Sequence, residues 1–228
     1  MIALVALLQI PFLTRAFHID DPLFIWAARH IRVNPANPYG FPVNWYGWNM
    51  QMFEVAKNPP FASYYIALTT IFLGWSETGI HGALLLPALL AGIGIYFVAN
   101  RFCGHPLLAA FAAILTPVFL VSGVTVMSDM WMLAFWVFAV YFWISGLDKD
   151  NHVFLAFGGF CIAMSAISKY FGMALIPLLL VYTIAKRRRF HVSLLYFLIP
   201  IGILAWYQIS TRQLYGRGLL LDAAQYST

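Results

Sequence analysis

The run LAFWVFAVYFWI, from Leu133 to Ile144, contains no charged side chain, and neither does LLYFLIPIGILAW, from Leu194 to Trp206. A strand of a membrane barrel would alternate apolar with polar residues, whereas these runs are continuously apolar and rich in Leu, Ala and Phe. Continuous apolar runs are typical of membrane helices. The two stretches therefore predict an all-α integral membrane protein.

The composition of the whole chain extends this prediction. The 228 residues are 62% hydrophobic and 9% charged, with a mean hydropathy of +0.80, whereas soluble domains carry about 25% charged residues. Most of the surface is therefore expected to face lipid. The net charge of +5 does not indicate nucleic-acid binding, because the basic run of Lys186 with Arg187 to Arg189 stands where a cytoplasmic anchor is expected.

Apolar runs that approach or reach the length needed to span a bilayer, about 17 to 25 residues, occur along the whole chain. We expect a single transmembrane module, 1–228, with about seven spans. They lie near residues 1–17, 80–100, 106–127, 131–147, 153–168, 171–185 and 191–211. The first could be a signal peptide, but it has no basic start and no small-residue cleavage site, so we interpret it as a retained helix.

Residues 18–79 differ in character, being rich in Asp, Asn, Pro, Gly and Trp, and are expected to form a folded loop with short interfacial helices. If the basic run and Arg101 and Lys149 face the cytoplasm, the spans alternate correctly only when the apolar segment from Pro60 to Trp75 does not cross. The same alternation places the loop, Asp129 and Lys169 together on the outer face.

Asp20 and Asp21 begin a helical stretch with Pro22 after them. They read either as helix caps, because Asp accepts from free amides and Pro suits the first turn, or as site residues. In the second interpretation one carboxylate accepts a proton from an acceptor hydroxyl. Neighbouring helical residues point about 100° apart, so the two cannot share one role.

Asp129 and the pair Lys169-Tyr170 also have a structural and a functional interpretation, and Lys57 has a functional one. Asp129 suits the first turn of a helix through the helix dipole, and Lys169-Tyr170 suits an interfacial anchor. Alternatively, Asp129 is a second site carboxylate, and the two lysines hold a phosphate at the outer interface.

The remaining candidates are His18, Trp45 and Tyr46, which lie in the loop and could contact a substrate. Trp and Tyr there suit either an interfacial belt or a sugar-stacking platform. No pair of histidines has a metal-ligand spacing such as HExxH, so we predict no metal and no cofactor; a divalent cation is possible but has no support in the sequence.

Four segments, taken in order, resemble the membrane-embedded GT-C glycosyltransferases, in the branch of the dolichyl-phosphate-mannose-protein mannosyltransferases and aminoarabinose-transferase-like enzymes. They are Asp20-Asp21, Lys57-Asn58-Pro59-Pro60-Phe61, Ser128-Asp129-Met130-Trp131 and Ser168-Lys169-Tyr170. The resemblance covers nearly the whole chain and implies a GT-C-type multi-helix transmembrane bundle.

This resemblance also implies a function. A sugar would pass, with inversion, from a polyprenyl-phosphate donor to a hydroxyl of an acceptor lipid, protein or glycan, at the periplasmic or outer face of the inner (plasma) membrane. Asp20 would be the base, Asp21 and Asp129 would organise acceptor and donor, and Lys57 and Lys169, with Tyr170, would bind the donor phosphate. The partners would be these substrates and membrane lipid, and not nucleic acid.

The chain departs from the family pattern in two places. The family often has an arginine before the proline of the second span, where this chain has Leu86 before Pro87, and members usually continue beyond a position equivalent to Thr228. We therefore expect the family's C-terminal part to be missing. Two alternatives stay open: a transporter, whose acidic residues would line a path at the bilayer midplane, and an inactive fragment or scaffold.

Overall fold

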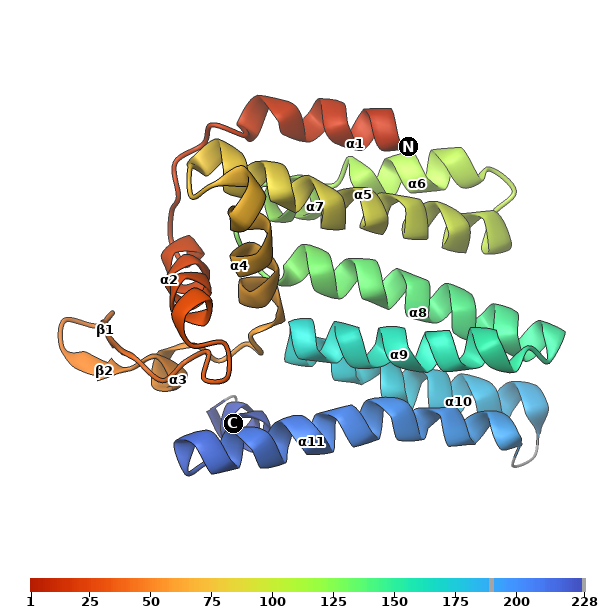
Figure 1. The fold of residues 1–228 in the computed structure, drawn as a ribbon. Helices are drawn as coiled ribbons and strands as arrows, with labels where there is room; N and C mark the ends of the chain where they lie inside the picture. Colours follow the sequence, from red (N-terminus) through yellow and green to blue (C-terminus); the bar gives the residue numbers. More distant parts are fainter. Residues whose placement is uncertain (189–190, 227–228) are drawn as a thin grey trace.

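The computed structural model describes residues 1–188 and 191–226, so Arg189 of the basic run lies outside the described residues. The fold is a bundle of helices with a compact loop region at one end (Figure 1). The helices of the bundle are α1 (Ile2–Gln9), α5 (Glu77–Phe102), α6 (Pro106–Ile114), α7 (Pro117–Gly123), α8 (Asp129–Lys149), α9 (His152–Ser168), α10 (Leu175–Arg187) and α11 (Leu198–Tyr215). Short 3-10 segments lie at Ile10–Phe12 (η1), Tyr170–Ala174 (η2) and Val192–Phe197 (η3).

The loop region and the C-terminal end hold the remaining elements. These are α2 (Asp21–Val33), the antiparallel strands β1 (Pro42–Asn44) and β2 (Asn49–Gln51), α3 (Met52–Val55), α4 (Phe61–Leu73) and α12 (Leu219–Tyr226). Figure 1 shows α4 drawn across the end of the bundle, at a steep angle to α5 and α8. α4 has 13 residues, which is short for a span and suits the interfacial position that the charge pattern predicts.

Four helical stretches in the described residues are long and apolar enough to cross a membrane, or five if one bent pair counts as a span. The four are Glu77–Phe102, Asp129–Lys149, Tyr170–Arg187 and Val192–Tyr215. Together with the absence of any sheet beyond the one hairpin in the described part, they confirm the predicted all-α, multi-pass membrane fold. α9 and the first helix are apolar but shorter.

The predicted span at 106–127 is divided into α6 and α7, which are bent by 63°. Pro117 explains the break, because a proline within a helix removes an amide donor and clashes with the preceding turn. Thr116 then starts α7 as a cap, its hydroxyl accepting a hydrogen bond from the Phe119 amide at 3.4 Å. The bend ends in the loop of residues 124–128, whose Val126 amide contacts Asp21 at the start of α2.

The centre of the bundle is the pair α8 and α9, which pack closely because glycines face the partner helix. A Cβ on Gly146 would lie 2.9 Å from the Leu155 side chain, and one on Gly158 would lie 3.1 Å from the Trp143 amide nitrogen. The Trp143 indole donates a hydrogen bond to the Thr183 hydroxyl at 2.9 Å, which joins α8 to α10. Thus, the aromatic run that predicted the membrane helix also forms the core.

Ion pairs join three helices at the bundle end opposite the loop region. The Asp148 carboxylate contacts both Arg101 of α5 and Lys186 of α10, and Asp150 contacts Arg187. We call this the basic end. The predicted grouping of basic turns at one end of the bundle is therefore present in the described residues.

Candidate active site

Asp20 and Asp21 stand at the start of α2, and their environments differ. The Asp21 side chain is 1% exposed. Its Oδ2 accepts a hydrogen bond from the His18 amide at 3.1 Å, and its Oδ1 accepts one from the Val126 amide at 2.9 Å. A buried carboxylate is costly unless it is hydrogen-bonded in this way. Asp21 therefore fastens the loop of residues 124–128 to the start of α2.

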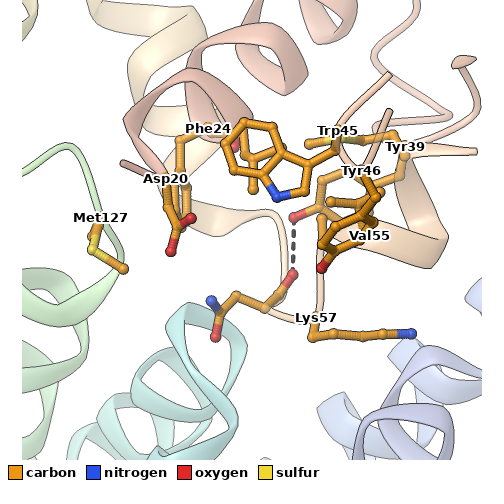
Figure 2. Close-up of a pocket in the computed structure, with 13 residues that line it drawn as sticks. Asp20, Phe24, Tyr39, Trp45, Tyr46, Val55, Lys57 and Met127 are labelled. Atoms are coloured by element: carbon orange, nitrogen blue, oxygen red, sulfur yellow. Dashed lines mark hydrogen bonds between the residues drawn. The ribbon is translucent and has the colours of Figure 1, made fainter. Parts of the chain in front are cut away.

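Asp20 occupies the cap position of α2, yet its side chain makes no capping hydrogen bond within the described part of the chain. Its φ of −88° and ψ of −5° are helical, whereas a capping side chain needs an extended backbone to reach the amides of the first turn. The half-buried carboxylate instead lines a cavity and lies near Met127 (Figure 2). Capping therefore does not account for Asp20.

The cavity beside Asp20 has a volume of about 230 Å³ and is lined by residues from separate segments. α2, the β1–β2 turn, the segment between α3 and α4, and the loop of residues 124–128 all contribute walls. The polar and aromatic lining includes Asp20, Tyr39, Trp45, Tyr46 and Lys57, and Met127 adds an apolar side chain. Four of the residues selected from the sequence thus share one cavity.

The aromatic wall of this cavity comes from the β-hairpin. Trp45 meets Trp26 of α2 edge to face, with ring centroids 6.0 Å apart, and Tyr46 lies 5.9 Å from Trp48. Gly47 between them has a φ of +92°, which only a glycine adopts at no cost, and so allows the tight turn. Tyr46 is 51% exposed, so this wall meets both the cavity and the solvent.

Tyr39 was not selected from the sequence, yet it holds two walls together. It is 2% exposed; its hydroxyl donates to the Asn58 carbonyl at 2.9 Å, and its amide donates to the Tyr215 hydroxyl at 3.1 Å. The first bond is the dashed line in Figure 2. Burial raises the pKa of Tyr39 well above its ordinary value, so the phenol stays protonated and remains a donor.

Lys57 follows α3 and lines the cavity. In Figure 2 its side chain runs away from Asp20. Its ammonium lies 2.8 Å from the Asp222 carboxylate of α12. The next residues, Asn58-Pro59-Pro60, lead directly into α4, because proline is compatible with the first turn of a helix.

Asp129 and Lys169 are partners of each other. The Lys169 ammonium donates to Asp129 Oδ1 at 2.7 Å, and the two side chains are 31% and 28% exposed. Asp129 belongs to the first turn of α8, and Lys169 ends α9. Neither lines the cavity, although Met127, two residues before Asp129, does.

Tyr170 lies beside a second, larger hollow. Its hydroxyl donates to the Tyr207 hydroxyl at 3.3 Å, and Tyr207 lines a hollow of about 580 Å³ between α11, the start of α4 and residues 35–39. The lining is mainly apolar and includes Trp206, which is 66% exposed. Tyr39 lines both hollows, so they are adjacent.

His18 contributes its backbone amide to Asp21, while its Nδ1 atom is buried and has no hydrogen-bond partner in the part of the chain that is described. It does not line the cavity. In the same described residues, no three His, Cys, Asp or Glu side chains are grouped as a metal site would need.

The residues that sequence reasoning missed are Tyr39, Met127 and Asp222. Tyr39 carries no sequence signal beyond its place in the loop. Asp222 did carry a sequence signal, because it follows the last predicted span. The alternation of spans puts the segment after that span on the same face as the loop of residues 18–79.

Comparisons with known proteins agree with this architecture. A family model described as dolichyl-phosphate-mannose-protein mannosyltransferase matches residues 57–209. A search of curated proteins finds no match. The chain is similar to a solved structure, the crystal structure of ArnT from Cupriavidus metallidurans bound to undecaprenyl phosphate, with a TM-score of 0.66 and 18% identity. This likeness confirms the predicted GT-C-type fold.

The similarity to the ArnT structure covers 94% of this chain and 42% of that one. The chain thus spans about two fifths of its length.

Proposed function

This chain belongs to the dolichyl-phosphate-mannose-protein mannosyltransferase family, and on that premise we propose that it is a membrane glycosyltransferase that uses a polyprenyl-phosphate sugar. The main support for the proposal is the cavity beside Asp20. The Asp20 side chain makes no capping hydrogen bond in the described residues and lines this cavity together with the aromatic wall and the Lys57 segment. Sugar transfer from a phosphate is helped by a carboxylate that takes the acceptor proton and by a cation that stabilises the leaving phosphate, and aromatic rings can stack on a sugar.

The proposed reaction is a single displacement at the anomeric carbon. The oxygen of an acceptor hydroxyl forms a bond to that carbon, while the bond from the carbon to the carrier phosphate breaks, and the electron pair leaves with the phosphate. Asp20 accepts the proton of the hydroxyl. One displacement inverts the configuration, and the leaving phosphate needs charge stabilisation rather than a proton.

Asp21 has a different part in this proposal. Both of its oxygens accept backbone hydrogen bonds, so it positions Asp20 and the loop of residues 124–128 and does not take the proton. This division agrees with the geometric argument that adjacent helical residues point in different directions.

The donor phosphate is assigned to the cations near the cavity. Lys57 lines it, and Lys169 is held beside α8 by Asp129. Undecaprenyl phosphate is bound in the ArnT structure of the same fold, which supports a polyprenyl-phosphate carrier here. The apolar hollow along α11, next to Tyr170, suits an isoprenoid chain, because its lining is mainly hydrophobic.

The acceptor is assigned to the hairpin side, where Trp45 and Tyr46 offer ring faces on which a sugar or another flat group can stack. The acceptor would be a lipid, protein or glycan hydroxyl. The cavity opens at the bundle end away from the basic end, which supports a site on the outer face of the membrane, since basic turns favour the cytoplasm.

Sugar transfer from a radiolabelled polyprenyl-phosphate sugar tests this function in membranes that express the chain. Wild type is compared with Asp20→Asn, Asp129→Asn and, as a matched control, Asp148→Asn at the basic end. We expect transfer in the wild type and the control, and its loss in Asp20→Asn at equal expression. Transfer that survives Asp20→Asn would refute the base assignment, and a wild type inert with several sugars would refute the function.

A further inference from the structure

A chain of charged side chains connects the cavity to the C-terminal helix α12. Glu54 of α3 lies 2.8 Å from Arg217, Arg217 lies 3.3 Å from Asp222, and Asp222 lies 2.8 Å from Lys57. The two carboxylates balance the two cations. Lys57 is thus held by an anion at the place where the proposed function puts a phosphate.

The return of the chain after α11 is fixed by side chains and is not a loose tail. Gly216 ends α11 with a φ of +73°, which suits glycine. The Leu219 amide then donates to the Thr211 hydroxyl at 3.1 Å, and the Leu220 and Leu221 amides donate to Gln208 Oε1 at 3.1 and 3.3 Å. These bonds satisfy the first amides of α12, which a helix leaves unpaired.

Apolar contacts press the same segment against the loop region. The Phe53 ring stacks on Tyr215 with centroids 4.8 Å apart, and the Arg217 guanidinium lies 5.2 Å above the Phe53 ring. Leu219 is 4% exposed in a cluster that includes Tyr39 and Met52. Packing therefore sets the position of Asp222, and its contact with Lys57 follows from the fold.

Asp222 carries its negative charge at neutral pH. The hydrogen bond from Lys57 lowers the pKa of this carboxyl below its ordinary value, against a smaller opposing effect of burial. The Lys57 and Asp222 side chains are 27% and 18% exposed, so the pair is partly accessible to a charged group. A second anion at Lys57 would therefore meet an existing one.

We propose that Asp222 is a positioning residue, which holds the Lys57 ammonium in a resting orientation and is displaced from it by the phosphate of the polyprenyl carrier. This inference rests on the proposed function, since it takes Lys57 as a phosphate ligand. Because one anion replaces the other, Lys57 has an anionic partner both when the cavity is empty and when it holds the carrier phosphate. A cation near the membrane is therefore never left without a counter-charge.

The direction in which Asp222→Asn changes phosphate binding separates this role from a purely structural one. Removing the competing carboxylate by Asp222→Asn, which keeps the side-chain shape, strengthens phosphate binding. A partly exposed ion pair of this kind corresponds to an affinity gain of about two- to fivefold. A residue that only braced α12 would weaken binding when removed.

Titration of the purified chain with undecaprenyl phosphate, followed by tryptophan fluorescence, measures this effect. We expect tighter binding by Asp222→Asn, weaker binding by Lys57→Gln, and binding by the double variant equal to that of Lys57→Gln alone. Asp148→Asn, which removes another carboxylate that contacts two cations, is the control and binds as the wild type does.

The two hypotheses fail in distinguishable ways. Unchanged or weaker binding by Asp222→Asn, with Lys57→Gln weakened, would overturn the exchange and leave the proposed function intact. Unchanged binding by Lys57→Gln would remove Lys57 from the donor site, and with it the exchange. Tighter binding by Asp222→Asn that persists in the double variant would also overturn the exchange, because the gain would not pass through Lys57.

Discussion

The two ends of the bundle both place one carboxylate between two cations, but with different consequences. At the basic end, Asp148 contacts Arg101 and Lys186, which belong to long apolar helices. At the loop end, Asp222 contacts Lys57 and Arg217, which lie on short connecting segments. The first arrangement joins the ends of helices, whereas the second borders a cavity.

The role of an ion pair in this protein therefore depends on the residues that surround it. At the basic end, the charges lie at the ends of long apolar helices and pair with each other. At the loop end, Asp20 lines the cavity without a capping bond, and Asp129 and Lys169 pair with each other nearby. Variants of matched residues at the two ends test this difference.

Asp20→Asn is expected to lower the rate of sugar transfer about 10²- to 10⁴-fold, the usual contribution of a general base, because an amide cannot take the proton. Asp148→Asn at the basic end is expected to leave the rate unchanged. The measurement is transfer of a radiolabelled sugar by equal amounts of folded protein. Similar losses in both variants would remove the functional difference between the two ends.

Asp21→Ala is expected to destabilise the protein by about 2–4 kcal/mol, because one buried and one partly buried backbone amide lose a charged acceptor. Asp21→Asn, which keeps one acceptor oxygen, should cost about half as much. The measurement is the unfolding free energy in detergent.

Asp150→Ala is the matched variant at the basic end, where the Asp150 side chain is 65% exposed; it is expected to cost less than about 1 kcal/mol. Equal costs for Asp21→Ala and Asp150→Ala would contradict the tethering role of Asp21.

Lys169→Gln is expected to reduce transfer about 10- to 100-fold, somewhat less than the loss of a main charge stabiliser in a closed site, because the lysine is partly exposed. Lys186→Gln at the basic end is its control and should not affect transfer. Steady-state rates at several donor concentrations measure the effect. A decrease of the same size in both variants would indicate a general effect of charge.

Acidification is expected to have the smallest effect, which is measured at the loop end. The pKa of Asp222 is lowered in the folded protein, by the Lys57 hydrogen bond first of all. A carboxylate with a lowered pKa stabilises the fold above its unfolded pKa, about 3.9, and this stabilisation is lost as the pH falls through the folded value.

Protection of the α12 amides from hydrogen exchange, corrected for intrinsic rates, should therefore stay constant from pH 8 to about 5 and fall only below about pH 4. Asp222→Asn should remove this dependence. Loss of protection between pH 7 and 5 would contradict the assignment.

The helices of the bundle could be predicted from the sequence, and the bend within 106–127 could not. Apolar runs reveal helices because a bilayer forces the backbone to pair internally. The 63° bend at Pro117 depends on how α6 and α7 pack on their neighbours, since proline permits several kinks and breaks.

The candidate site was predictable in part, because its acids interrupt apolar sequence and therefore stand out. Asp20, Lys57, Trp45 and Tyr46 do line one cavity. Tyr39 and Met127 were missed, because their types are common in loops and near membranes. Their position depends on contacts between segments far apart in the chain, such as the bond from Val126 to Asp21.

The sequence by itself determined that this is a multi-pass α-helical membrane protein with a group of basic turns at one end of the bundle, because hydropathy and charge act on each segment separately. Only the tertiary structure decided that Asp21 is a tether while Asp20 faces the cavity, and that Asp222 reaches Lys57 across 165 positions of the chain. Neighbours in sequence share composition, but hydrogen bonds and burial depend on which distant segment comes to lie beside each of them.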